Sequence, residues 1–292
     1  MRIKKFKKWH LIWMLPVAFL ITANLAGCFQ FRDSDRKIAS KLKSKHLFPS
    51  FHDYKNGKQT IHYWDIPNAG KPLVMFVHGS PGSSTALMTI ATDSVFMQHF
   101  MPVLVDRPGF GYSNFGRGEQ SLSKQSTWLT DILKLYPNEK KILVGHSLGG
   151  PLVAKMAMDY PNEISAIVIL AGSIDPDLEP KEWYRKPMNS PFIRWLVPKA
   201  FAASNDEILT LKSELQKMIP DWEKIKIPIV VIQGTDDFLV NKGNADFAKK
   251  MAKNAPIKVK MLPKESHFFP FTKPQITVEE LLLLESKLDT LH

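Results

Sequence analysis

The sequence predicts an α/β fold, in which helices cover both faces of a mostly parallel sheet. Two observations predict it: short apolar, β-branched runs alternate with helix-like segments from Thr60 onward, and most of these runs are apolar at every position. Continuously apolar strands are typical of parallel sheets, because helices cover both faces of such sheets. With 292 residues, of which 44% are hydrophobic, the chain is long enough to bury a large core.

The expected strands and helices follow one another in a regular order. The strands are the runs TIHYWDI, PLVMFVHG, MPVLVD, KILVGHS, AIVILAG, IPIVVIQG and IKVKMLP. Helix-like segments cover about residues 84–98, 121–136, 148–159, 241–254 and 275–288. This alternation indicates βαβ units, which place successive strands side by side in one sheet.

Residues 175–222 interrupt the alternation. The segment holds six of the chain's 21 prolines together with the aromatic residues Trp183, Tyr184, Phe192, Trp195, Phe201 and Trp222. We expect a lid insertion that covers the carboxyl ends of the strands, where open sheets hold their sites. We also expect its aromatic side chains to be buried there as an apolar wall. The core then has a first part at 55–174 and a second part at 223–292.

The first 27 residues have the layout of an export signal. Five basic residues lie among the first ten, an uncharged apolar run follows from Leu11 to Ile21, and small residues come last. The run is shorter than the about 20 residues that a membrane-spanning helix needs, and Pro16 interrupts it. The only cysteine of the chain, Cys28, directly follows Leu25-Ala26-Gly27.

A leucine, two small residues and a cysteine in this order resemble the signal of bacterial lipoproteins. The resemblance implies cleavage before Cys28 and acylation of its sulfur, whereas a lone cysteine has no partner for an internal disulfide. Two or three acyl chains, at about 0.8 kcal/mol per buried CH₂, hold a protein stably on a membrane. We therefore expect a signal peptide at 1–27, a polar tether and lead-in at 28–54, and a lipid anchor in a bacterial envelope membrane that faces the periplasm or the exterior. The alternative is an uncleaved anchor with an incidental cysteine.

The net charge of +11 does not indicate a nucleic-acid partner. Five of the positive charges belong to the first ten residues, and the others are scattered rather than gathered into one basic stripe. Adhesion to anionic lipid headgroups is compatible with such a surface. No His, Cys and Asp cluster has the spacing of a metal site, and no dinucleotide-binding glycine motif follows a strand. We expect no cofactor and no metal.

The stretch KILVGHSLGG predicts a nucleophile. Glycines at 145 and 149 allow a sharp turn between a strand and a helix, which exposes the hydroxyl of Ser147 beside a helix N-terminus. A serine hydroxyl needs a base, and the base needs a carboxylate that holds its tautomer. In this arrangement the order along the chain is serine, acid, histidine. Only His267 and His292 follow Ser147, and His292 is the last residue, so we choose His267. The side chain of His146 should point away from the hydroxyl and pack in the core.

The acid is expected at the end of the strand IPIVVIQG. We prefer Asp237, because it precedes the apolar residues FLV that re-enter the fold. Asp236 is then a solvent-facing turn residue, and Asp175 is a weaker alternative. A tetrahedral oxyanion needs two backbone donors. We expect one from the N–H of Leu148 and the other from the HGSPG loop, at Ser80.

The segments HGSPG, DRPGFGYS, GHSLGG, GTDD and the late SHF stand in the order of the α/β-hydrolase superfamily, and the resemblance covers about residues 55–290. It implies a serine hydrolase with Ser147 as nucleophile, His267 as base and Asp237 as the orienting acid. Relatives with an aspartate nucleophile, the dehalogenases and epoxide hydrolases, are disfavoured because position 147 is serine. One departure is Ser266, since the family often has glycine directly before its catalytic histidine.

Three functions follow from this interpretation. The first is hydrolysis of a small-molecule ester, thioester or lactone through an acyl-enzyme at the cell envelope. The second is amide or peptide cleavage by the same triad, because relatives that remove an amino-terminal proline carry a related HG-x-PG loop. The third is a lipoprotein that keeps the fold and only binds an apolar ligand or another protein, since a fold alone does not imply a function.

Overall fold

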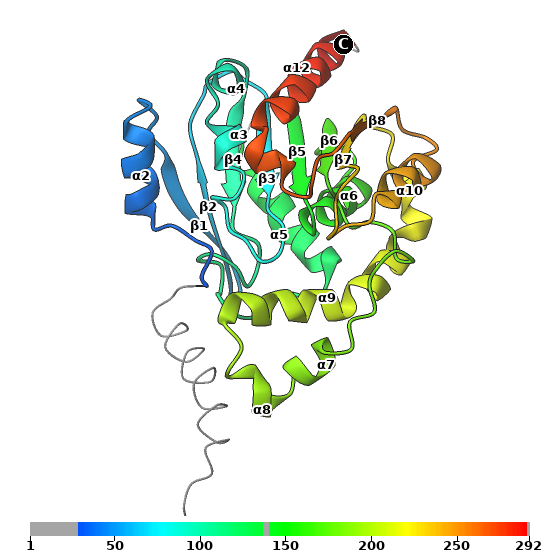
Figure 1. Cartoon of the computed structure of the whole chain (residues 1–292). Helices are drawn as coiled ribbons and strands as arrows, with labels where there is room; N and C mark the ends of the chain where they lie inside the picture. Colours follow the sequence, from blue (N-terminus) through cyan, green and yellow to red (C-terminus); the bar gives the residue numbers. More distant parts are fainter. Residues whose placement is uncertain (1–28, 137–139, 291–292) are drawn as a thin grey trace, which may run out of the picture.

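The computed structural model describes residues 29–136 and 140–290, in which eight strands form one twisted sheet between two layers of helices (Figure 1). The strands lie in the order β1-β2-β4-β3-β5-β6-β7-β8. β2 is antiparallel to both β1 and β4, and all other neighbours are parallel. Their bounds are β1 Ser50–Asn56, β2 Gln59–Asp65, β3 Leu73–Val77, β4 Met101–Val105, β5 Lys141–His146, β6 Ala166–Leu170, β7 Ile229–Gly234 and β8 Ile257–Leu262.

The mostly parallel sheet confirms the predicted fold class. β2 to β8 occupy the seven runs that the sequence indicated, and every residue of β3 to β7 is buried. Side chains alternate between the faces with the period of two that a strand imposes. In β3, Leu73, Met75 and Val77 enter one core, and Val74 and Phe76 enter the other.

Each face of the sheet is covered by its own set of helices (Figure 1). The first layer contains α5 (Leu122–Lys134), α6 (Gly149–Asp159) and α10 (Gly243–Met251). The second contains α2 (Asp35–Lys43), α3 (Met88–Ala91), α4 (Ser94–His99), α11 (Phe269–Thr272) and α12 (Pro274–Thr290). None of the helices within the described ranges is long and apolar enough to cross a membrane.

The segment expected as a polar tether and lead-in is folded from residue 35 onward. It forms α2 and β1, and the side chains of Ile38 and Leu42 on α2 are only 1% exposed. The hydroxyl of Ser34 begins the helix by accepting from the N–H of Lys37. The lysines of this stretch occupy the solvent side of an amphipathic helix, which is why it reads as polar. Cys28 and the expected signal peptide lie outside the described residues.

The segment 175–222 crosses the carboxyl ends of the strands, but its aromatic side chains do not form the expected wall. Its long helix α9 (Lys199–Met218) runs along this edge, and α7 (Arg185–Met188) and α8 (Pro191–Arg194) lie beyond α9, on the side away from the sheet (Figure 1). Trp183 is 83% exposed and Phe192 87%, whereas Trp222, in the 3₁₀ helix η1 (Ile219–Lys224), is buried. The expected burial is wrong for the four aromatics between 183 and 195, which are exposed because α9 already covers the strand ends with its own side chains, among them Leu211, Leu215 and Met218.

Candidate active site

Ser147 stands in a left-handed turn between β5 and α6. Its φ is 54°, a conformation that few residues other than glycine adopt. Its N–H donates to the carbonyl of Leu170 at 2.9 Å, which ties the turn to the neighbouring strand β6. The Ser147 hydroxyl has no hydrogen-bond partner in the part of the chain that the structure describes. A partly exposed hydroxyl on a strained turn is therefore free to meet a substrate.

Two glycines make this turn possible. A Cβ on Gly145 would lie 2.3 Å from the carbonyl oxygen of Gly149, and a Cβ on Gly149 would lie 2.2 Å from that of Val77. Both distances are far below van der Waals contact. The GHSLG pattern is thus required for α6 to approach β3 and β5 closely enough to hold Ser147 at the strand end.

The predicted acid and base are in contact. Nδ1 of His267 lies 2.8 Å from Oδ2 of Asp237, and both side chains are almost completely buried. The other oxygen of Asp237 accepts from the N–H groups of Leu239 and Val240. Burial alone would raise the pKa of this carboxyl, but the hydrogen bonds from His267 and from the two N–H groups outweigh it and hold the pKa below its ordinary value. Asp237 is therefore an anion at neutral pH and fixes the Nδ1–H tautomer of His267.

The alternative acids lie elsewhere. Asp236 is exposed, and within the described ranges its carboxylate accepts a hydrogen bond only from the hydroxyl of Thr235. Asp175 accepts from the N–H of Asp177 and makes no contact with a histidine among the described residues. His292 is outside the described residues. The structure thus brings His267 to the preferred acid and to neither alternative.

His146 is buried and packs against the predicted base. The rings of His146 and His267 lie 4.7 Å apart, and Nε2 of His146 is 3.2 Å from the carbonyl oxygen of His267. Burial, assisted by the nearby His267, lowers the pKa of His146 to about 3. His146 is therefore neutral and donates its Nε2–H to that carbonyl. Because His146 immediately precedes Ser147, this contact holds the His267 loop beside the nucleophile.

The two backbone N–H groups that the sequence indicated as oxyanion donors belong to segments beside Ser147. The loop after β3 lies against the nucleophile: a Cβ on Gly79 would be 2.8 Å from the Cβ of Ser147. The N–H groups of Ser80 and Leu148, the two predicted donors, have no acceptor among the described residues. His78 stiffens this loop, because its Nδ1 donates to the carbonyl of Gly79 at 2.6 Å and its Nε2 accepts from the N–H of Arg107 at 2.9 Å.

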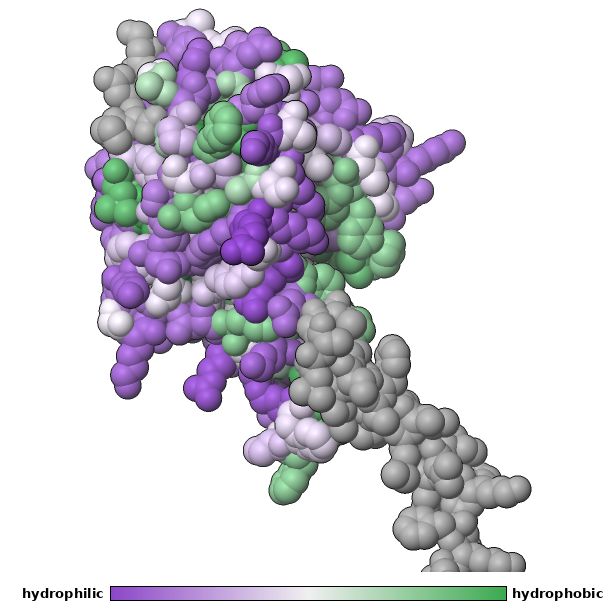
Figure 2. Space-filling view, turned by 90° about the vertical axis from the view of Figure 1, so that its left-hand side faces the viewer, coloured by the Kyte–Doolittle hydropathy of each residue, from purple (hydrophilic) through white to green (hydrophobic). Residues whose placement is uncertain are grey.

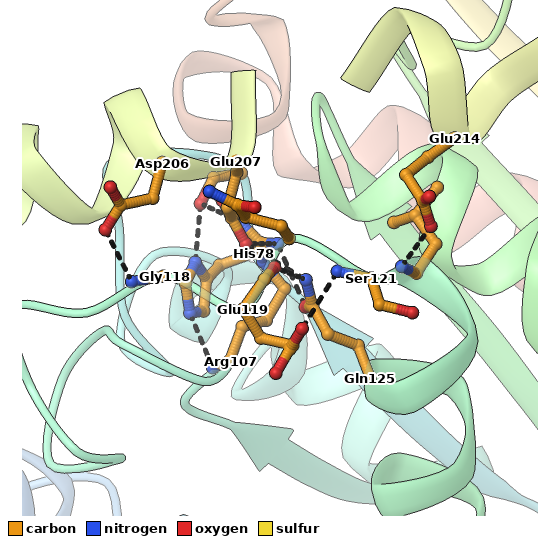
Figure 3. A network of polar contacts seen from close by, with 12 residues as sticks. His78, Arg107, Gly118, Glu119, Ser121, Gln125, Asp206, Glu207 and Glu214 are labelled. Atoms are coloured by element: carbon orange, nitrogen blue, oxygen red, sulfur yellow. Dashed lines mark hydrogen bonds and ion pairs between the residues drawn. The ribbon is translucent and has the colours of Figure 1, made fainter. Parts of the chain in front are cut away.

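A buried ion pair that the sequence did not reveal joins α9 to this loop (Figure 3). The guanidinium of Arg107 donates to both carboxylate oxygens of Glu207 on α9, at 2.8 and 3.0 Å, and also to the carbonyl of Gly79 at 3.3 Å. Gln125 on α5 adds a hydrogen bond to Glu207 at 3.1 Å. The insertion and the candidate oxyanion loop therefore share one network. Arg107 belongs to the DRPGFGYS stretch, but nothing around Glu207 marks it as its partner.

The DRPGFGYS stretch also contains a structural carboxylate. The buried side chain of Asp106 accepts from the N–H of Ser84 at 2.6 Å and from that of Tyr112 at 2.8 Å. Gly111 has a φ of 52°, and a Cβ there would overlap the Asp106 carboxyl at about 2.0 Å. The motif thus ties together the loops that follow β3 and β4. Within the described ranges, no group of three or more His, Cys, Asp or Glu side chains could hold a metal ion.

The comparison with family models agrees with the fold and with the placement of these motifs. Residues 72–216, which include the HGSPG, DRPGFGYS and GHSLGG segments, match the model of the alpha/beta hydrolase fold. The chain is a member of the α/β-hydrolase superfamily. In this fold the turn after β5, the loop after β7 and the loop after β8 meet at one edge of the sheet, as Ser147, Asp237 and His267 require.

Relatives and solved structures show what the chain is similar to. It is 31% identical over 121 residues to a pimeloyl-acyl-carrier protein methyl ester esterase of Wigglesworthia glossinidia brevipalpis, a match that covers 41% of this chain and 44% of the relative. The chain thus spans less than half the length of the curated relatives that it matches.

A membrane phospholipase A described as a bacterial virulence factor has a TM-score of 0.67 at 15% identity, over 95% of this chain and 98% of that structure. An N-acyl homoserine lactone degrading enzyme has 0.63 at 14%, over 79% and 98%. At these identities the two structures show a shared fold.

Proposed function

We propose that the protein is a membrane-anchored serine hydrolase that cleaves a carboxylic ester, thioester or lactone through an acyl-enzyme intermediate. The observation that carries the proposal is the 2.8 Å hydrogen bond between His267 and Asp237 at the sheet edge where the strained turn presents Ser147. The three residues come from three different loops. Packing of the core does not by itself require Asp237 and His267 to meet, nor to follow Ser147 in the order of a catalytic triad.

The geometry supports the following reaction. With Nδ1–H of His267 donated to Asp237, the lone pair of Nε2 is free to take the proton of the Ser147 hydroxyl as its oxygen attacks the substrate carbonyl carbon. The N–H groups of Leu148 and Ser80 stabilise the resulting oxyanion, and one such donor contributes about 3 kcal/mol in other hydrolases. The tetrahedral intermediate collapses with cleavage of the C–O or C–S bond, and the leaving alkoxide or thiolate takes the proton from His267. Water, activated by the same histidine, then releases the acid from Ser147.

The relatives support an ester rather than an amide as substrate. The curated relative bears the name of a methyl ester esterase, and the titles of the two similar structures name a phospholipase A and a lactone degrading enzyme. A carbonyl carbon with an oxygen or sulfur leaving group suits the same attack by Ser147. The lipid anchor rests on the Leu25-Ala26-Gly27-Cys28 sequence, and its test is fractionation of the Cys28→Ser variant.

Labelling with a fluorophosphonate, followed by assays on p-nitrophenyl esters and aminoacyl arylamides, tests the proposed activity. We expect wild-type protein and Ser123→Ala, which alters an exposed serine on α5, to be labelled and to hydrolyse esters. Ser147→Ala should do neither. A clear preference for arylamides would replace the esterase proposal by a peptidase with the same triad. Full ester hydrolysis by Ser147→Ala would contradict both.

A further inference from the structure

The segment that carries α7 and α8 exposes a cluster of large apolar side chains, which we call the aromatic tip. Trp183 is 83% exposed, Phe192 87% and Trp195 64%, and Tyr184 and Ile193 lie beside them in the sequence with about 40% of their surfaces exposed. Soluble monomers rarely gather so many large apolar groups in one exposed place. In Figure 1 α8 is the lowest coloured helix. Figure 2 is turned about the vertical axis, and its lowest coloured part ends in a hydrophobic group beyond a mostly hydrophilic surface.

The aromatic tip is held in place by polar contacts on its inner side. The buried side chain of Asn205 on α9 donates to the carbonyl of Arg185 at 2.9 Å. Arg194 on α8 donates to both carboxylate oxygens of Asp206 at 2.6 and 2.7 Å. Both short helices are therefore fixed to α9. Their aromatic side chains point to solvent because of this attachment, and the sheet edge beneath is already covered.

The charges around the aromatic tip are positive. Residues 181–199 contain five basic residues and one acid, Glu182. Arg185 pairs with that acid and Arg194 pairs with Asp206. The ammonium groups of three exposed lysines pair with no carboxylate among the described residues; these are Lys181, Lys186 and Lys199. Exposed aromatics beside unpaired cations match the chemistry of an anionic lipid surface.

The chain enters the fold at the same end of the molecule. The ring of Phe29, the first described residue, lies 5.9 Å from that of Phe201 on α9, and the ring of Phe31 lies 5.5 Å from it. The guanidinium of Arg32 is 4.2 Å from the centre of the Tyr112 ring, which attaches this segment to the loop after β4. Cys28 is covalently joined to Phe29. The proposed acylation site is therefore one residue away from a ring that packs against α9.

We propose that the aromatic tip is a membrane-docking surface that inserts into the headgroup region of an anionic bilayer and turns the carboxyl edge of the sheet toward the lipid. Tryptophan and tyrosine favour the boundary between headgroups and acyl chains, and the three free lysines meet anionic headgroups. Ser147, at that same edge, then receives its substrate from the membrane side. The proposed anchor enters only through the position of Phe29 beside α9, and membrane docking does not depend on catalysis.

Photocrosslinking of the full chain tests this proposal. p-Benzoylphenylalanine replaces Trp183 or Phe192, and the matched control replaces Phe48, which is 69% exposed. Phe48 precedes Ser50, whose partner Asp65 pairs with Val103 in the middle of β4, while Tyr63 pairs with Val105 at the carboxyl end of that strand. The control therefore lies toward the amino edge of the parallel strands, away from α9. The proteins are irradiated in native membranes and in vesicles of phosphatidylcholine with or without phosphatidylglycerol, and adducts are identified by mass spectrometry.

We expect lipid adducts at positions 183 and 192, at least about fivefold more than at position 48 and more with phosphatidylglycerol present. Replacing the three free lysines by glutamine should remove the preference for phosphatidylglycerol. Equal yields at all three positions, or no lipid adduct, would overturn the proposal. Protein adducts at position 192 in native membranes would show that the aromatic tip binds a protein instead of a bilayer. If the lysine variant kept the preference for phosphatidylglycerol, the choice of an anionic surface would be overturned. Fluorophosphonate labelling of the same samples measures the reactivity of Ser147, so a failure of membrane docking can be told apart from a failure of the proposed catalytic function.

Discussion

Replacing Glu207 by glutamine removes the negative charge that faces Arg107 and leaves the shape of the side chain almost unchanged. The guanidinium of Arg107 is 1% exposed, so water cannot take the place of the lost carboxylate. The wild-type pair contains two charge-assisted hydrogen bonds, at 2.8 and 3.0 Å. Each such bond contributes about 1.5–3 kcal/mol, and the single oxygen of glutamine retains at most one of the two, now between a charged donor and a neutral acceptor. The expected loss in the free energy of unfolding is about 3 kcal/mol, as for other buried pairs that lose one partner.

Urea unfolding followed by tryptophan fluorescence measures this loss. The matched control is Glu223→Gln, which makes the same chemical change in the exposed pair with Lys253, where we expect a loss of about 0.5 kcal/mol or less. The double variant Arg107→Met, Glu207→Leu removes both charges and should recover most of the stability. A loss for Glu207→Gln no larger than that for Glu223→Gln would refute the role assigned to this pair in attaching α9 to the loop after β3.

Three further predictions concern the acid, the buried histidine and the lipid anchor. Asp237→Asn should lower kcat on an ester by about ten-thousand-fold, as the same change does in other triads, whereas Asp236→Asn should leave it within about twofold; equal effects would place the acid wrongly. His146 has a folded-state pKa of about 3 against 6.5 when unfolded, so the unfolded state binds more protons and stability falls as the pH drops through this window. Between pH 7 and pH 5 the wild-type protein should therefore lose about 2 kcal/mol more of its free energy of unfolding than His146→Gln, and equal losses would contradict a buried neutral imidazole. Cys28→Ser should shift the protein from the detergent phase to the aqueous phase in a phase-partition assay, and unlipidated wild-type protein would contradict the anchor.

The sequence predicted those features that local pattern determines. β2 to β8 were predictable because each is a short run of apolar, β-branched residues, and parallel strands are apolar at every position. The placement of Asp237 against His267 also followed, since both lie at the ends of strands and the fold fixes the order of nucleophile, acid and base. α2 was not predicted, because only Ile38 and Leu42 among its polar and basic residues enter the core.

Two other features depend on contacts between distant parts of the chain. Arg107 and Glu207 are separated by 100 positions, and neither lies in a pattern that names the other. From the sequence, the aromatic residues in and around α7 and α8 were expected to be buried. They are exposed because α9 covers the strand ends, and the Arg107–Glu207 pair attaches α9 there.

The most direct test of the central claim is to trap the covalent intermediate. A p-nitrophenyl ester is mixed with the protein, the reaction is quenched in acid during the first turnover, and the intact mass and the peptide map are measured. We expect one added acyl group on the peptide that contains Ser147, and no such adduct in Ser147→Ala or His267→Ala. An acyl group on another residue, or ester hydrolysis that continues at the wild-type rate in Ser147→Ala, would contradict it.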